Sequence, residues 1–124
     1  MKNGSKVYFC SRISEPQDVI EKFDKPVEYT LRPNYLTIQP AGGYMDFQNF
    51  GEFVNITHNG LATPYEKWID IFKEGDRVYI DKTPKGFEDN VEPEEGWGND
   101  ANAKIVAVKG QNRAVRLTIQ NILE

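Results

Sequence analysis

The chain has 124 residues, of which 39% are hydrophobic and 27% are charged, and its formal net charge is −4. This balance is typical of a globular protein, so we expect residues 1–124 to form a single domain. The negative charge argues against a general nucleic-acid binder, which carries a basic surface. Because Cys10 is the only cysteine, an intrachain disulfide and a cysteine-based metal cluster are excluded.

Nothing in the sequence predicts contact with a membrane. No apolar run approaches the roughly 18 residues of a spanning helix, and the N-terminal residues lack the apolar segment of a signal peptide. We therefore expect an intracellular protein in which Cys10 is a reduced, buried thiol.

The first third of the chain alternates between strand-like and irregular segments. Residues 6–13 are a predicted strand with Val7 and Phe9 on one face and Tyr8 and Cys10 on the other. After Ser14, a weak helical stripe predicts a short helix within residues 14–23: Val19, Ile20 and Phe23. Residues 27–32 alternate apolar and polar side chains, which predicts a strand, and residues 35–39 resume the extended run. The interruption at Pro33-Asn34 predicts a bulge or turn, or an edge position where proline is tolerated.

The next segment is rich in aromatic residues. Residues 40–43 (PAGG) form a turn by composition, and residues 44–53 follow with four aromatic side chains. Residues 53–58 are predicted as a strand that ends at Asn59-Gly60, a strong turn dipeptide. His58, the only histidine, is expected at the surface, where it supports neither a metal site nor a catalytic triad.

A capped helix followed by a strand is predicted in the middle of the chain. Thr63 is the expected N-cap, and Glu66 completes a capping box three residues later. The helix is expected over residues 64–73, and Gly75 ends it before a strand at residues 77–81. One apolar stripe on this helix is expected to enter the core: Tyr65, Trp68, Ile69 and Phe72.

The longest predicted loop covers residues 83–100 and is called the acidic loop below. It contains two prolines, three glycines and six acids against one base, Lys85, so its charge is −5 and the remainder of the chain carries −4 − (−5) = +1. A loop of this length is usually functional or disordered, so both a recognition loop and a solvated, mobile insertion remain open. Its candidate partner-binding residues are Phe87, Glu88, Asp89, Glu92, Glu94, Glu95 and Trp97.

The chain ends in a predicted hairpin. Residues 105–108 and 115–120 are expected strands joined by a turn at residues 110–112. Ile105 and Ala107 are expected on one face and Val106 and Val108 on the other, and in the second strand Val115, Leu117 and Ile119 are expected to face inward. Together these elements predict a mainly β fold, a small β-barrel or sandwich with one short helix.

No arrangement typical of an enzyme is present. The sequence lacks a P-loop and a dinucleotide-binding fingerprint, and the acids of the acidic loop do not follow the spacing of a calcium-binding EF-hand. Carboxylates on a Gly- and Pro-containing loop also lack the rigid placement that a glycosidase requires. We therefore expect no catalytic residues, no metal and no cofactor.

Aromatic residues on loops are the alternative source of function, because they anchor protein interfaces. Besides Phe87 and Trp97, a second cluster surrounds the PAGGY turn and is a candidate subunit interface or plug: Gly42, Gly43, Tyr44, Phe47 and Phe50. The alternative is that this second cluster folds back over the end of the sheet.

Three stretches in fixed order resemble one family. PAGGYMDFQNFGE (40–52), PYEKWIDIFKEGDRVYID (64–81) and ANAKIVAVKGQNRAVRLTIQNI (101–122) cover 53 of the 124 residues. In these stretches the chain resembles the head-closure, or head–tail joining, proteins of long-tailed bacteriophages and related prophages. The resemblance implies a small β-barrel that forms a homo-oligomeric ring beneath the portal and its adaptor after DNA packaging. It further implies that the ring extends the DNA channel, helps to retain the genome and offers a docking surface to the tail.

The resemblance also implies partners and a location. The partners are the portal–adaptor ring and a tail-completion protein, the subunit can be a monomer in solution, and DNA passes through without sequence-specific binding. The protein is then located in the virion connector, and in the bacterial cytoplasm during assembly. We expect residues 83–100 to face the channel or the next ring component, with residues 40–52 as the competing plug. The alternatives are a tail terminator or tail-completion protein, and a monomeric protein-binding module whose acidic loop recognises a basic peptide.

Overall fold

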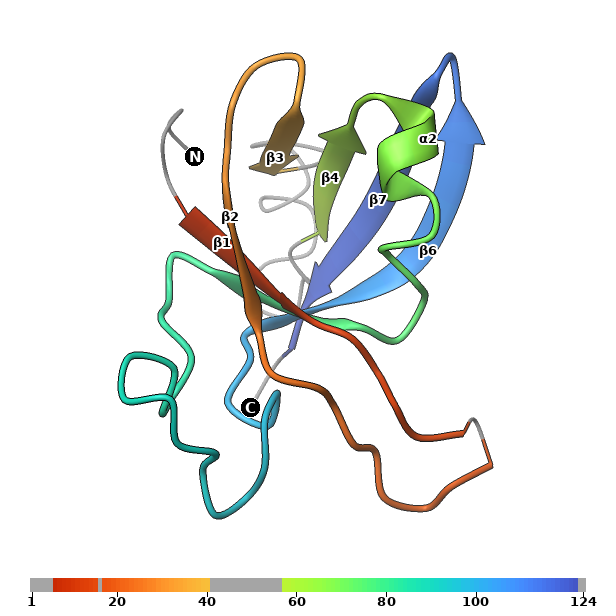
Figure 1. The fold of residues 1–124 in the computed structure, drawn as a ribbon. Coiled ribbons are helices and arrows are strands. Elements are labelled where there is room, and N and C mark those ends of the chain that lie inside the picture. Colours follow the sequence, from red (N-terminus) through yellow and green to blue (C-terminus); the bar gives the residue numbers. More distant parts are fainter. Residues whose placement is uncertain (1–5, 16, 41–56, 123–124) are drawn as a thin grey trace, which may run out of the picture.

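The structure is a computed structural model that describes residues 6–15, 17–40 and 57–122. In these residues seven strands form one antiparallel sheet in the order β2-β1-β5-β6-β7-β4-β3, accompanied by one short helix (Figure 1). The elements are β1 (Lys6–Cys10), β2 (Val27–Thr30), β3 (Leu36–Pro40), β4 (Thr57–Ala62), α2 (Tyr65–Trp68), β5 (Arg77–Ile80), β6 (Ala103–Gln111) and β7 (Ala114–Asn121).

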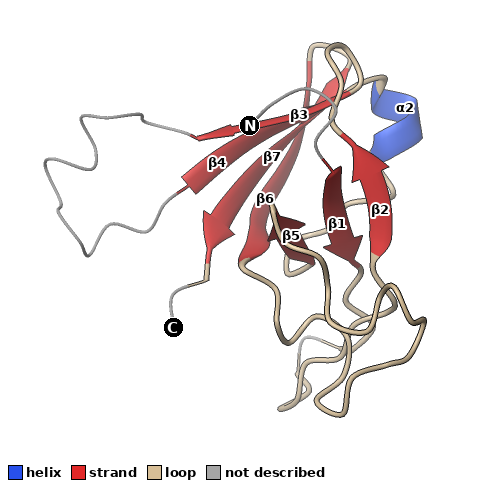
Figure 2. Cartoon of the chain, turned by 90° about the vertical axis from the view of Figure 1, so that its left-hand side faces the viewer, coloured by secondary structure: helices blue, strands red, loops and turns tan. Residues whose placement is uncertain are grey.

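The sheet folds over on itself without closing. Figure 2 shows β3, β4 and β7 on one side and β1 and β2 on the other. A turn joins the two edge strands, β2 and β3, and within it Arg32 and Leu36 form an isolated antiparallel β-bridge. In the described residues, β2 and β3 are not hydrogen-bonded to each other as a ladder. The mainly β prediction is confirmed, and the open sheet fits a sandwich better than a closed barrel.

The main core lies inside this fold and contains much of the predicted apolar pattern. The rings of Trp68 and Phe72 stack with their centroids 5.3 Å apart. The ring centroid of Phe9, in β1, lies 4.5 Å from that of Phe72. In β1 the predicted alternation is confirmed, because Val7 and Phe9 enter this core while Tyr8 and Cys10 face the opposite side. Cys10 is fully buried, as expected.

The C-terminal hairpin is confirmed, with one irregularity. Val115, Leu117 and Ile119 are all buried. A bulge between Ile105 and Ala107 in β6 places Val108 against the same core as Ile105. The simple alternation predicted for residues 105–108 is therefore wrong, because the extra residue of a bulge shifts the register of the side chains that follow it.

The predicted capping box is wrong. The Thr63 hydroxyl donates to the Asn34 carbonyl (2.7 Å) instead of accepting from the helix, and Pro64 is the N-cap with extended backbone angles. The Thr63 carbonyl accepts the Trp68 indole N–H (2.9 Å). The helix α2 covers only Tyr65–Trp68, so it is shorter than the helix predicted at residues 64–73.

The turn predicted at Asn59-Gly60 is also wrong, because both residues lie inside β4, which is paired on both sides. Gly60 is opposite Leu117, and a Cβ atom at this glycine would lie 3.1 Å from the Leu117 Cβ. Tight cross-strand packing explains the glycine here. His58 is consequently buried at 8% exposure and not at the surface as predicted.

The helix predicted over residues 14–23 does not form. The Ser14 hydroxyl accepts hydrogen bonds from Arg12 Nε (3.0 Å) and the Lys22 amide (3.1 Å), which draws the two sides of a loop together. Phe23 is buried, whereas the other two members of the supposed stripe, Val19 and Ile20, are 98% and 70% exposed.

Candidate functional site

The acidic loop is built into the fold through contacts with the outer face of β1 and β5. The Phe87 ring lies 4.9 Å from the ring of Tyr8 in an edge-on arrangement. Asp100 accepts hydrogen bonds from the Tyr79 hydroxyl (2.6 Å) and the Lys85 amide (2.8 Å). The loop thereby covers a second apolar cluster, which consists of Tyr8, Cys10, Phe23, Tyr79, Ala101 and the partly buried Phe87.

The far end of the acidic loop is held by two further contacts. The Asn102 side chain accepts from the Ile80 amide (2.9 Å) and donates to the Ile80 carbonyl (2.7 Å), so it continues the pairing between β5 and β6 beyond Ala103. Gly98, at φ +86°, packs on Phe23, and a Cβ atom there would lie 2.8 Å from the ring. The acidic loop and residues 11–24, called the 11–24 segment below, are therefore packed against each other.

Burial beneath the acidic loop also determines the protonation of the groups it covers. Burial, and next the nearby Asp100 charge, raises the pKa of the Cys10 thiol to about 12. Burial, and next the hydrogen bond to Asp100, raises the pKa of Tyr79 well above its ordinary value. Both groups are neutral at physiological pH, and a protonated thiol is a poor nucleophile.

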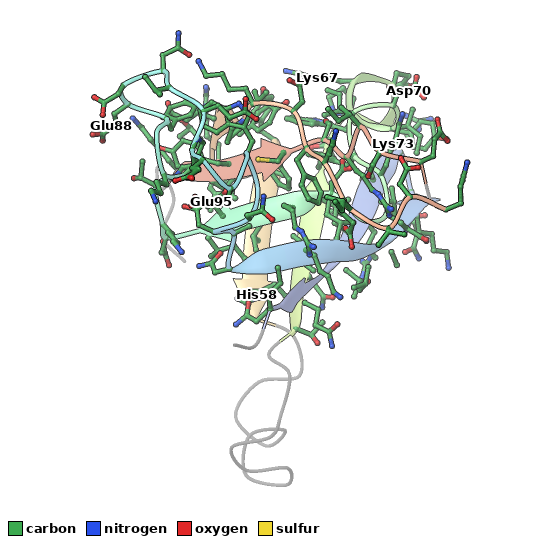
Figure 3. All side chains as sticks on the ribbon, turned by 90° about the horizontal axis from the view of Figure 1, so that it is seen from below. His58, Lys67, Asp70, Lys73, Glu88 and Glu95 are labelled. Atoms are coloured by element: carbon green, nitrogen blue, oxygen red, sulfur yellow. The ribbon has the colours of Figure 1, made fainter. Side chains whose placement is uncertain are left out.

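The predicted loop residues divide into an inner and an outer set. Phe87 and Trp97 are half-buried, and Glu95 forms an ion pair with Lys85 (3.3 Å). The outer acids are exposed and make no hydrogen bond or ion pair in the described part of the chain: Glu88, Asp89, Glu92 and Glu94. Figure 3 shows Glu88 and Glu95 on the opposite side of the molecule from Lys67, Asp70 and Lys73.

A cleft of about 320 Å³ lies between parts of the acidic loop and the 11–24 segment, beside their contact at Phe23. Its apolar lining includes Phe23, Trp97, Ile13 and Ile20, and the last two are 61% and 70% exposed. Its acidic lining comprises Glu21, Glu92, Glu94 and Glu95, against one base, Lys22. A cleft lined by apolar and acidic side chains suits a segment that carries both apolar and basic side chains.

The sequence does not predict the 11–24 segment as part of this site. Its apolar residues are visible in the sequence, but their spacing predicts one face of a helix instead of an exposed loop. The second predicted cluster, Gly42, Gly43, Tyr44, Phe47 and Phe50, lies outside the described residues.

A basic surface, also missed from the sequence, lies on the β6–β7 hairpin. Residues 103–121 contain four Lys or Arg and no Asp or Glu, a charge of +4. Lys109 and Arg116 are direct cross-strand partners. The turn residues Asn112 and Arg113 both have positive φ, 52° and 64°, as a tight hairpin turn requires. Within the described ranges none of its four cations forms an ion pair: Lys104, Lys109, Arg113 and Arg116.

The described residues contain no group of three or more His, Cys, Asp or Glu side chains placed to hold a metal ion. None of the described helices has the length and apolar character needed to cross a bilayer. Comparison with known proteins finds no matching family model, no similar curated protein and no similar solved structure.

Proposed function

We propose that the chain is a structural, ring-forming subunit of a phage head–tail connector, which closes the head after DNA packaging and offers a docking surface to the tail. The supporting observation is the acidic loop, which is anchored on β1 and β5 with four unpaired acids directed outward. A fixed acidic surface is a suitable lining for a DNA channel or a suitable contact for the next ring.

The physical basis is repulsion between like charges that cannot move away. Two exposed unit charges 4 Å apart interact by about 1 kcal/mol in water and about 4 kcal/mol at the lower effective dielectric near a protein surface. Repeated around a ring, the free carboxylates of each acidic loop would repel phosphates from every direction. DNA would then pass without being gripped, and without any contact that reads its sequence.

The two side chains best suited to nucleophilic or acid–base chemistry support a non-catalytic role. Cys10 is buried and protonated, and His58 is buried with an Nδ1 atom that has no hydrogen-bond partner in the described residues. They lie on β1 and β4, which are not neighbours in the sheet. A nucleophile needs a base within hydrogen-bonding distance, and this arrangement does not provide one.

A second candidate function is a protein-binding module that recognises a basic peptide. The observation that favours it is the cleft beside Trp97, whose lining offers apolar side chains to the stem of an arginine or lysine and carboxylates to its charge. This candidate requires no ring.

The deciding experiment adds the purified chain to portal–adaptor complexes of the same phage and examines them by electron microscopy. We expect an additional ring below the adaptor. Binding to the ends of tail tubes instead would assign the protein to the tail as a terminator or completion protein. Binding to neither would overturn the connector proposal in favour of the peptide-binding module.

The role of the acidic loop is tested by neutralising charges. Deletion of the loop is unsuitable, because Phe87 and Asp100 hold it over the second cluster. In the variant Glu88→Gln/Asp89→Asn we expect DNA ejection from assembled heads to slow, since an uncharged lining no longer repels phosphates. The matched control, Glu74→Gln/Asp70→Asn, changes the same residue types at exposed positions outside the loop. Equal ejection rates in both variants and wild type would contradict a channel-facing loop.

A further inference from the structure

The two ends of the molecule carry opposite charges that are not paired with each other. The acidic loop carries −5, whereas the turn end of the β6–β7 hairpin (residues 109–116) carries three cations and no acid: Lys109, Arg113 and Arg116. Figure 1 shows the acidic loop and the 11–24 segment at the lower end and the β6–β7 turn at the upper end. One copy of the chain cannot bring these surfaces together, whereas two copies can.

The β6–β7 hairpin has the properties of a preformed docking element. Lys109 and Arg116 face each other across the strands, and like charges in that position destabilise a sheet unless an anion neutralises them. The turn is supported by α2, because the Tyr65 amide donates to the Arg113 carbonyl (2.9 Å) and its ring lies beneath Gly110. Glu66 lines the depression beside this turn but forms no ion pair in the described residues. A turn held in this way loses little conformational entropy on binding.

The cleft beside the acidic loop has complementary properties. Two of its four glutamates are already engaged, Glu21 with Arg77 (3.3 Å) and Glu95 with Lys85 (3.3 Å). Glu92 and Glu94 have no partner in the described residues and remain available to incoming cations. Trp97 offers an aromatic surface for the stem and guanidinium of an arginine.

From this complementarity we propose that copies of the chain associate head to tail, with the β6–β7 hairpin of one copy docked into the cleft of the next. The hairpin and the cleft are different surfaces of one subunit. A pair of bound copies therefore still has one free hairpin and one free cleft, to which further copies can bind. Such a heterologous contact generates a ring when its rotation closes. The proposal deepens the proposed function, on which it rests, by naming the two contact surfaces.

Charge reversal tests this contact in solution. We would measure sedimentation velocity at low ionic strength and protein concentrations up to about 1 mM, where weak association is detectable. The cleft variant Glu92→Lys/Glu94→Lys and the hairpin variant Lys109→Glu/Arg113→Glu should each raise the dissociation constant at least about tenfold, because attraction becomes repulsion. An equimolar mixture of the two variants, and a single chain with all four changes, should regain association.

The control variant Asp70→Lys/Glu74→Lys changes the net charge by the same amount as the cleft variant, at exposed positions outside the cleft. It should associate like wild type. Wild type that stays monomeric throughout, or a mixture that fails to regain association, would overturn the proposal. A cleft that binds an arginine-rich peptide while the chain stays monomeric would do so too, in favour of the peptide-binding module.

The sedimentation experiment and the portal experiment can fail independently of each other. Rings that assemble on the portal equally well with the hairpin variant would eliminate this contact and leave the connector proposal intact. Restored association in the variant mixture, without binding to the portal, would establish the contact and eliminate the connector.

Discussion

At the scale of single residues, Asp76 is the most constrained charged group in the described part of the chain. Its side chain is 1% exposed, and its two carboxylate oxygens accept from the Arg12 amide (3.0 Å) and the Lys73 amide (3.1 Å). Its own carbonyl accepts from Ile105 (2.8 Å). Burial raises the pKa of this carboxyl, and the two amide hydrogen bonds partly oppose that effect. Asp76 thus connects the 11–24 segment, the stretch after α2 and β6.

We predict that Asp76→Asn destabilises the fold. An amide side chain has one acceptor oxygen, so one of the two backbone N–H groups would face an NH₂ group and lose its partner, at a cost of about 1–3 kcal/mol. Urea unfolding measures the change. Asp70→Asn is the control, because Asp70 is exposed and should change stability by no more than about 0.5 kcal/mol. Equal stability of the two variants would contradict this role of Asp76.

His58 makes stability depend on pH. Burial lowers the pKa of its imidazole, so the folded chain binds a proton less readily than the unfolded chain does. The unfolded state therefore takes up protons first as the pH falls past the ordinary histidine pKa of about 6.5, and the free energy of unfolding decreases in that range. We predict a fall in stability between about pH 7 and pH 5 for wild type, measured by urea unfolding.

The chain has no other histidine, so His58→Gln should reduce this pH dependence. An unchanged slope in the variant would assign the titration to a different group.

At the scale of elements, the acidic loop and the 11–24 segment behave as one structural unit. They meet at Phe23 and Gly98, and together they cover the face of β1 and β5 that points away from the main core. The cleft exists because both segments are held in place. Disturbing their contact should therefore affect stability and the cleft at the same time.

We predict that Gly98→Ala destabilises this unit more than Gly96→Ala. Both glycines have positive φ, +86° and +91°, so both substitutions carry a similar backbone strain of about 1 kcal/mol or more. Only at Gly98 would the new Cβ atom meet the Phe23 ring at 2.8 Å, whereas at Gly96 it meets the side-chain amide of Asn99 at 3.3 Å. Urea unfolding and amide hydrogen exchange of residues 83–100 measure the difference. Identical effects of the two substitutions would mean that the Phe23 contact contributes nothing.

At the scale of the whole molecule, the described chain is electrically asymmetric. The net charge of −4 conceals an acidic loop of −5 and a C-terminal hairpin of +4. Such a distribution orients approaching copies and is screened by salt within about 10 Å at 0.1 M ionic strength. Head-to-tail association and its salt dependence therefore belong to this scale.

Local patterns in the sequence determined most of the strands. Alternation in β1 and β7 predicted which side chains enter the core. Pro33-Asn34 predicted an interruption as a bulge, a turn or an edge position, and the structure has the turn before β3 there, where Asn34 has φ 61°. These predictions hold because successive side chains of a strand point to opposite faces of the sheet, so the alternation within the segment itself shows which side chains share a face. The acidic character of residues 83–100 was equally visible, because charge is a property of composition.

Only the tertiary structure decided which faces are covered and by what. Tyr79 and Cys10 are buried because the acidic loop, distant in sequence, packs over them. Asn59-Gly60 favours a turn by itself, but pairing with both β3 and β7 keeps it extended. Thr63 favours a helix cap by itself, but Asn34 takes its hydroxyl. In each case a contact between residues far apart in sequence outweighs a local preference of roughly 1 kcal/mol, and such contacts exist only once the chain has folded.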